Sequence, residues 1–364
     1  MSRRRPTPVG TYGLAASLPP TRVGPHVRTA PFLVCRPAPP SRSQLAFRLA
    51  IVALALLLAA CTGIQSTFST FGTEAASTRA LTVAMVTGAT IITVAVLALA
   101  FHAVRAPEGS LDHRRGMSVI LWLGAIGPTL ILAALLASTL PTMRTLAAKP
   151  GDLEIRVDGE QFWWRVQYKP AHGEPVEAAN EIRLPVGRTV TFSLASPDVI
   201  HSFWIPGLAG KMDMIPGRIT RLVVQATSPG QYRGACAELC GLSHALMAFD
   251  VTAMEAADFD RWLAAQAQPA TAPAAPGGQL FDEYGCAGCH RVRGLPRGSP
   301  IGPDLTHFGS RPTVAASTLP MELAAVAKFI RDPAAIKPAA LMPSFREMPD
   351  DDALVIARWL MELR

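Results

Sequence analysis

The chain has few charged residues and few cysteines for its length. Asp, Glu, Lys and Arg make up 17% of its 364 residues, against about 25% in an average soluble protein. Hydrophobic residues make up 49%. This balance argues against an ordinary soluble protein and favours segments that lie within a membrane. The six cysteines do not form a disulfide framework, because two pairs are each followed by a histidine at metal-site spacing.

Acidic residues are missing altogether from residues 1–60, which contain eight arginines. Since the whole chain has 34 basic and 27 acidic residues, the remainder holds 26 basic and 27 acidic side chains. The formal net charge of +7 therefore belongs to this first segment. A nucleic-acid-binding domain would carry a basic patch of its own, so no nucleic-acid partner is predicted.

Residues 1–60 are predicted to be a leader or signal region that lies outside the fold. Residues 1–41 are rich in Pro and Arg, and the apolar run at 49–58 is too short to span a bilayer. The run ends in Leu58-Ala59-Ala60-Cys61, which resembles the lipobox of bacterial lipoproteins. On this interpretation Cys61 becomes the lipid-bearing first residue of the mature protein. The alternative is an incidental cysteine.

Residues 61–144 are predicted to form a transmembrane helix hairpin. Two apolar runs, at about 80–104 and 117–140, are each long enough to cross a bilayer. Pro128 is expected to kink the second helix, which neighbouring helices can tolerate. Pro141 is expected to mark its end.

The loop between the two apolar runs sets the predicted orientation of the hairpin. It carries Arg105, Arg114 and Arg115. Positively charged loops stay preferentially in the cytoplasm. Both ends of the hairpin then face outward, which agrees with an exported N-terminus.

Residues 145–266 are predicted to form an all-β domain. From about Gly151 the pattern changes to short alternating runs separated by Gly and Pro. Several short strands at such spacing are typical of a β-sandwich or barrel. The expected strands include residues 153–157, 181–184, 189–194, 219–225 and 247–251.

A cluster of metal-binding side chain types lies near the end of this domain. Cys236, Cys240, His244 and Met247 fall within one short stretch, and upstream of them a possible strand could deliver His201. Thiolate and thioether are soft ligands that select copper, and imidazole also suits it. Two cysteines this close could instead pair as a disulfide, but a structural bridge would not require the histidine and methionine at these offsets.

A second site lies beyond a Pro/Ala-rich linker at residues 267–278. The domain at 279–364 opens with Cys286-Ala287-Gly288-Cys289-His290, the attachment signature of c-type haem. A redox dithiol would require a βαβ pattern and a zinc site would require another ligand pair, and neither is visible.

An electron-transfer haem needs a second axial ligand, for which methionine is typical. Met342 and Met348 are each followed by proline. Met342 is the predicted ligand, because its surroundings resemble the ligand loop of small bacterial cytochromes c. Met348 directly precedes the expected final helix.

Together these motifs resemble subunit II of cytochrome c oxidase with a fused cytochrome c domain, the caa-type of haem-copper oxidase. The resemblance covers roughly residues 61–364. It implies a multidomain protein: a transmembrane hairpin, a cupredoxin-like all-β barrel and an all-α class I cytochrome c domain. In the implied copper A site, Cys236 and Cys240 supply bridging thiolates, and His201 and His244 supply terminal imidazoles. Met247 supplies an axial thioether, and Glu238 supplies its backbone carbonyl.

The resemblance also implies a function. Electrons would enter at a haem c on Cys286, Cys289, His290 and Met342, and then pass to copper A. They would continue to haem a of subunit I, where oxygen is reduced and protons are translocated. The aromatic segment with Phe162 and Trp163 would lie where electrons reach the copper. The Glu238 side chain would contact a magnesium ion at the boundary with subunit I.

The resemblance further implies subunits I and III, a cytochrome donor and membrane lipid as partners. The protein would lie in the bacterial inner membrane as a multi-pass protein, with both metal domains on the periplasmic side. The alternative function is a membrane-tethered copper chaperone or thiol reductant, which would need neither Glu238, His244 and Met247 in register nor a haem. A quinol oxidase subunit would lack the copper ligands. Nitrous oxide reductase would carry a large propeller domain.

Overall fold

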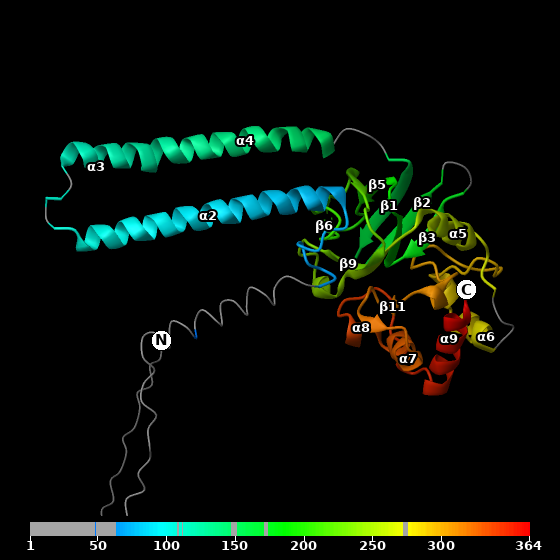
Figure 1. Ribbon diagram of the computed structural model, residues 1–364. Coiled ribbons are helices and arrows are strands. Elements are labelled where there is room, and N and C mark those ends of the chain that lie inside the picture. Colours follow the sequence, from blue (N-terminus) through cyan, green and yellow to red (C-terminus); the bar gives the residue numbers. More distant parts are fainter. Residues whose placement is uncertain are drawn as a thin grey trace, which may run out of the picture. The chain divides into compact units, whose positions relative to one another are not determined.

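The computed structural model in Figure 1 describes residues 48, 63–107, 109–110, 112–146, 151–170, 174–271 and 276–364. Apart from Arg48, the predicted leader lies outside the described residues. Cys61 and its predicted lipidation lie outside them as well.

Two helical segments follow one another at the N-terminal side (Figure 1). The first is α2 (Thr73–Arg105), and the second runs through α3 (His113–Val119), η1 (Ile120–Ile126) and α4 (Gly127–Leu146). Both segments are long and apolar enough to cross a membrane. Most of their large apolar side chains are exposed, as expected of side chains that face lipid.

The helix bounds differ from the sequence-based expectation. The first helix begins at Thr73 rather than near residue 80. The prediction that Pro141 ends the second helix is wrong, because α4 continues to Leu146. A proline removes one hydrogen bond from a helix, and transmembrane helices tolerate this loss. Ahead of Pro128 the helix adopts the π-helical turn η1, in which the Gly127 N–H donates to the Trp122 carbonyl five residues earlier.

The β-rich domain is a sandwich of two five-stranded sheets, with orders β3-β2-β1-β5-β8 and β4-β10-β9-β6-β7. The expected strands are all present, with ends shifted by a few residues. The bounds are β1 (Leu153–Glu160), β2 (Trp163–Lys169), β3 (Val176–Ala179), β4 (Glu181–Pro185), β5 (Thr189–Ala195), β6 (His201–Trp204), β7 (Met212–Met214), β8 (Thr220–Gln225), β9 (Gly230–Cys236) and β10 (Ala248–Met254).

Aromatic side chains fill the space between the two sheets. Burial alternates along β2, so Trp164 points into the core while Trp163 lies on the other face. The Trp164 ring lies 5.0 Å from the Phe249 ring and 5.9 Å from the Phe203 ring, centroid to centroid. A helix that the sequence did not predict, α5 (Ala256–Gln266), follows β10 and buries Phe259 in the same core.

The C-terminal domain is mostly helical and has its own core. The Phe281 ring on the first helix packs 5.3 Å from the Trp359 ring on the last. Within the expected linker, the Ala270 N–H donates to the Arg293 carbonyl at 3.0 Å. The elements are α6 (Pro276–Glu283), η3 (Cys286–Gly288), η4 (Phe308–Ser310), β11 (Thr313–Val314), β12 (Leu319–Pro320), α7 (Leu323–Arg331), α8 (Pro333–Ile336) and α9 (Asp350–Glu362).

Candidate metal and haem sites

The cluster of sulfur and imidazole side chains forms where strands of one sheet end. Cys236 is the last residue of β9, and His201 is the first residue of the neighbouring antiparallel strand β6. The Cys236 N–H donates to the Met247 carbonyl at 2.9 Å and so closes residues 237–246 into a loop. The Ala237 N–H donates to the Ser202 carbonyl at 2.9 Å, which ties this loop to β6.

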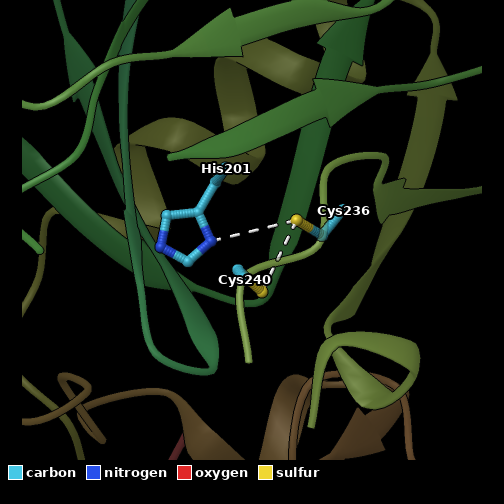
Figure 2. Close-up of side chains that lie close together, drawn as sticks. All are labelled: His201, Cys236 and Cys240. Carbon is cyan, nitrogen blue, oxygen red and sulfur yellow. Dashed lines mark hydrogen bonds between the residues drawn. The ribbon is translucent and has the colours of Figure 1, made fainter. Parts of the chain in front are cut away.

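Four of the six predicted copper ligands lie around the sulfurs of the other two, Cys236 and Cys240. The His201 imidazole points toward the Cys236 sulfur, with the Cys240 sulfur beside it (Figure 2). The distances are 3.8 Å from Cys236 Sγ to His201 Nδ1, 3.8 Å to Cys240 Sγ and 3.2 Å to the Glu238 carbonyl oxygen. From Cys240 Sγ they are 3.7 Å to His244 Nδ1 and 3.8 Å to Met247 Sδ.

The two cysteines are free thiols. Their sulfurs are 3.8 Å apart, far beyond the bond length of about 2.05 Å in a disulfide. The pKa of Cys236 is lowered to about 3, first by the hydrogen bond with Cys240 and further by the one with His201. A lowered pKa favours the thiolate, which is the form that binds metal.

Asp198 holds His201 in the orientation that the cluster requires. Its Oδ1 lies 2.8 Å from His201 Nε2, so Nε2 carries the proton and the lone pair of Nδ1 faces the sulfurs. Burial lowers the pKa of His201, but hydrogen bonds with Cys236 and Asp198 outweigh it and the pKa is raised. Such outer partners fix the tautomer of a metal-binding histidine. We did not assign this role to Asp198 from the sequence, although its position three residues before the histidine was a signal.

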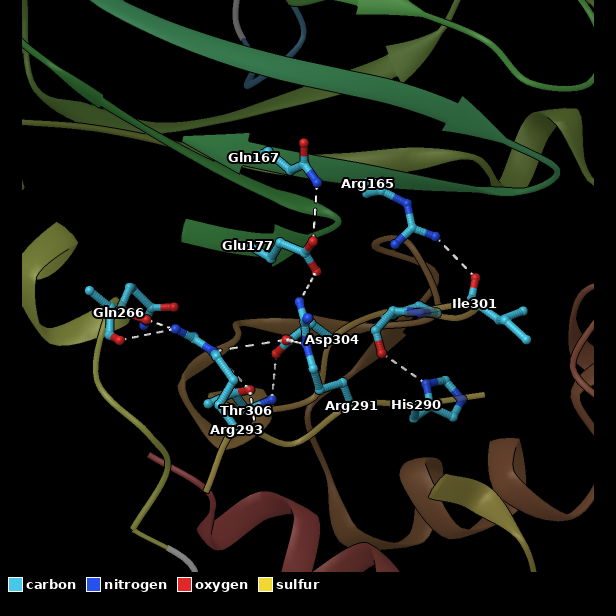
Figure 3. Close-up of polar contacts among 12 residues, drawn as sticks. Arg165, Gln167, Glu177, Gln266, His290, Arg291, Arg293, Ile301, Asp304 and Thr306 are labelled. Atoms are coloured by element: carbon cyan, nitrogen blue, oxygen red, sulfur yellow. Dashed lines mark hydrogen bonds and ion pairs between the residues drawn. The ribbon is translucent and has the colours of Figure 1, made fainter. Parts of the chain in front are cut away.

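The second predicted site lies around a cavity of about 320 Å³. Cys286, Cys289, His290 and Met342 all line it. The His290 Nδ1–H donates to the Pro303 carbonyl at 2.8 Å (Figure 3), which leaves the Nε2 lone pair free. Burial lowers the pKa of His290, so the imidazole is neutral and able to bind a metal.

Gly302 permits this placement of His290. A side chain carbon at Gly302 would lie 2.9 Å from the His290 ring, closer than real contacts allow. His307 has a different environment. Its side chain is buried, and Nε2 lies 3.1 Å from the Gln268 carbonyl oxygen. His307 is not among the residues that line the cavity.

The two candidate methionines occupy different surroundings. Met342 is partly buried and lines the cavity. Met348 is 3% exposed and belongs to the core of the C-terminal domain. The structure thus places Met342 with the cysteines and His290, and keeps Met348 away from the cavity wall.

Comparisons with known proteins agree with this geometry. Residues 165–254 match the family model of the cytochrome c oxidase subunit II periplasmic domain, and residues 274–364 match the cytochrome c family model. Cytochrome c oxidase subunit 2 of Alkalihalophilus pseudofirmus is 36% identical over 248 residues, which cover 65% of this chain and 71% of the relative. The chain belongs to the cytochrome c oxidase subunit 2 family.

Further relatives carry the same name. Cytochrome c oxidase subunit 2 of Bacillus sp. PS3 is 31% identical over 260 residues, which cover 68% of this chain and 72% of the relative. The periplasmic domain of subunit II of cytochrome oxidase from Bradyrhizobium japonicum is a solved structure with 30% identity and a TM-score of 0.31. It corresponds to 32% of this chain and 95% of that chain.

Family membership confirms the predicted fold class: an N-terminal pair of apolar helices, a cupredoxin-like β domain and a helical cytochrome c domain. A subunit 2 is a membrane-anchored component of an oxidase complex, with its β domain outside. The β domain implies copper A, and the cytochrome domain implies haem c.

The residues of this subunit 2 fit both groups. His201, Cys236 and Cys240 are buried, and their ligand atoms lie within 4.8 Å of one another. This is a soft donor set suited to copper. At the other site, two thiols, a neutral imidazole and a thioether share one cavity, which is the donor set of a methionine-ligated c-type haem.

The predicted aromatics lie between the two sites. Phe162 is 4% exposed, and Phe162 and Trp163 line the haem cavity together with the cytochrome domain. The neighbouring Gln161 donates from Nε2 to the Cys240 carbonyl at 2.5 Å. Nothing in the sequence around Gln161 pointed to this contact, since it joins residues 79 positions apart.

Glu238 has a carbonyl at the copper cluster and a carboxylate outside it. The carboxylate lies 3.9 Å from Lys211 Nζ, and both side chains are nearly half exposed. The predicted magnesium role of this carboxylate remains a prediction.

Proposed function

We propose that this subunit 2 accepts single electrons at its cytochrome c domain, passes them through its copper A site and delivers them to haem a of subunit I. There oxygen is reduced and protons are translocated. When bound, haem c and the copper pair supply the one-electron chemistry, and the protein sets ligation, position and dielectric. Cys286 and Cys289 would attach the haem, with His290 and Met342 as axial ligands.

At the copper site the two cysteines would bridge and the other donors would complete the shell. Cys236 and Cys240 would supply the thiolates, His201 and His244 the imidazoles, and Met247 and the Glu238 carbonyl the weaker donors. The observation that supports the proposal is that each of the other four donors lies within 3.8 Å of one of the two sulfurs, which are themselves 3.8 Å apart. A copper chaperone would have no use for this complete set.

The proposal also covers the membrane topology, the partners, the Glu238 carboxylate and Cys61. The helices α2 and α4 would cross the bacterial inner membrane as a hairpin, with Arg105, Arg114 and Arg115 in the cytoplasm. A cytochrome would donate electrons at the outer face, and subunits I and III would be the membrane partners. The Glu238 carboxylate would contact magnesium at the boundary with subunit I, and Cys61 would carry lipid.

The test is His244→Ala in the purified oxidase complex. The exchange should abolish the mixed-valence copper spectrum and cytochrome-driven oxygen consumption, while the haem of the cytochrome domain stays attached. His113→Ala, outside both sites at the start of α3, is the matched control and should change neither. An unchanged copper spectrum in His244→Ala would remove this residue from the ligands.

A further inference from the structure

Lys337 is a buried cation at the seam between the two metal-binding domains. It follows α8, and it is only 3% exposed. Its ammonium donates to the Phe162 carbonyl of the β domain at 2.5 Å and to the Ala315 carbonyl of the cytochrome domain at 3.2 Å. A single side chain therefore joins both domains.

This ammonium has no carboxylate partner. In the part of the chain that the structure describes, no carboxylate lies within 4.0 Å of Lys337. An ammonium has three N–H donors, and the two carbonyls use two of them. Burial lowers the pKa of Lys337 to about 7, although the charge of Cys240 opposes part of this shift. A buried charge is costly unless it is paired, so an anion at the ammonium would stabilise it.

Lys337 lines the haem cavity, so an anion held in this cavity can reach its ammonium. Arg311 lines the same cavity, and its Nε is buried without a hydrogen-bond partner among the described residues. A c-type haem carries two propionate carboxylates on its porphyrin edge. The cavity is thus lined by two cationic side chains that each keep an N–H group without a hydrogen-bond partner among the described residues. A bound haem would bring two carboxylates to accept from them.

We propose that Lys337 binds a propionate of the attached haem and, through the Phe162 carbonyl, fixes the haem domain against the segment whose Gln161 contacts the copper loop (residues 237–246). Lys337 is thus a positioning residue for electron transfer between the two sites. The inference rests on the proposed function, since it takes haem c and copper A to be present.

The contacts beyond Lys337 support this role. Phe162 is adjacent to Gln161, whose side chain amide donates to the Cys240 carbonyl at 2.5 Å. On the other side, the Ser243 hydroxyl of the copper loop donates to the Pro338 carbonyl at 2.7 Å, next to Lys337 itself. The Thr318 hydroxyl donates to the Leu246 carbonyl at 3.1 Å. Two hydrogen bonds therefore hold the copper loop close to Lys337. One comes from Gln161, next to the Phe162 that Lys337 contacts, and the other goes to Pro338, next to Lys337 itself.

The experiment compares Lys337→Met with Lys328→Met in the purified oxidase complex. Lys328 lies on the exposed face of α7 and is the matched control. The readouts are the midpoint potential of haem c, from a spectroscopic redox titration, and the rate of electron transfer from haem c to copper A after flash reduction. Removing the cation leaves the propionate charge uncompensated. The potential should therefore fall and the transfer should slow, whereas Lys328→Met should match the wild type.

An unchanged potential with an unchanged rate in Lys337→Met would overturn the inference. If Lys337→Met does not accumulate, Lys337→Arg and Lys337→Gln make the same comparison. The charged variant should keep the wild-type potential, and the neutral variant should lower it. Equal potentials in these two variants would also overturn the inference. A wild-type complex without the haem c or copper A signals would instead refute the proposed function.

Discussion

Met342 and Met348 show how one residue's surroundings decide its role. Both precede proline, but only Met342 lines the cavity with His290 and the attachment cysteines. We expect Met342→Ala to leave the haem attached and convert it to a high-spin or differently ligated form. Visible and near-infrared absorption of the oxidised protein would report the change.

Met348→Ala is the paired variant. Met348 is almost fully buried in the core of the cytochrome domain. Its truncation should lower the free energy of unfolding by about 2–5 kcal/mol while the haem spectrum stays that of the wild type. The reverse pattern, with the spectrum altered by Met348→Ala alone, would make Met348 the axial ligand.

At the scale of elements, the loop that carries Met342 is braced by one carboxylate. The Asp332 side chain accepts hydrogen bonds from the Ala335 N–H at 3.3 Å, from the Ser344 hydroxyl at 2.8 Å and from Arg346 Nε at 2.8 Å. Asp332 thus joins the start of α8 to the chain just beyond Met342. No helix or strand lies between α8 and α9, so these bonds contribute to the shape of the loop.

This bracing should depend on pH. Arg346 and then Ser344 hold the pKa of Asp332 below its ordinary value. A carboxyl with a depressed pKa stabilises the fold above its unfolded pKa, and this stabilisation is lost as pH falls through the lowered pKa. We expect Asp332→Asn to weaken methionine ligation at neutral pH, as seen in the near-infrared absorption of the oxidised haem. The difference from the wild type should shrink as the pH falls through that lowered pKa.

Asp282→Asn, on the exposed side of α6, is the control for this titration and should follow the wild-type curve. A constant gap between Asp332→Asn and the wild type at every pH would show that the Asp332 charge does not brace the loop.

At the scale of the whole molecule, a charged contact joins the β domain to the cytochrome domain. Arg291 donates to the Glu177 carboxylate at 2.6 Å and to the Asp304 carboxylate at 3.1 Å (Figure 3). Nearby, Arg165 donates to the Ile301 carbonyl at 3.0 Å. Arg165 and Glu177 lie on β2 and β3, so these two strands contact the cytochrome domain in addition to Phe162 and the copper loop.

We expect Glu177→Gln to slow electron transfer from haem c to copper A at low ionic strength and to make the rate less dependent on salt. The wild-type rate should fall as salt is raised, because salt screens the partly exposed Arg291–Glu177 ion pair between the domains, and the variant has lost that pair. Flash reduction at low and high ionic strength would measure the rate. Glu174→Gln, an exposed neighbour, is the control. Equal salt dependence in both variants and the wild type would mean that Glu177 does not hold the domains together.

The parts of this molecule that could be predicted are those that depend on residues close together in the sequence. Cys236 to Met247 and Cys286 to His290 are short segments, so their donor sets were visible as motifs. Strand alternation likewise predicted the sheets, because burial changes with every residue along a strand.

Contacts between distant segments could not be predicted in this way. Lys337 and Phe162 are 175 residues apart, and a lysine in a Pro/Ala-rich loop gives no sign of burial. Gln161 likewise meets Cys240 only through the fold. The continuation of α4 past Pro141 was not predicted, because a local proline rule ends the helix there, whereas a transmembrane helix can continue past a proline with the loss of one hydrogen bond.

Electron paramagnetic resonance on the purified full-length chain, produced with haem-attachment machinery and loaded with copper, tests most directly whether this chain holds both metal sites. We expect hyperfine structure from one electron shared over two copper nuclei, beside a low-spin haem signal. A single-copper spectrum would contradict this expectation. So would a copper-free protein in which Cys236 and Cys240 form a disulfide, a result that would favour a copper chaperone or thiol reductant.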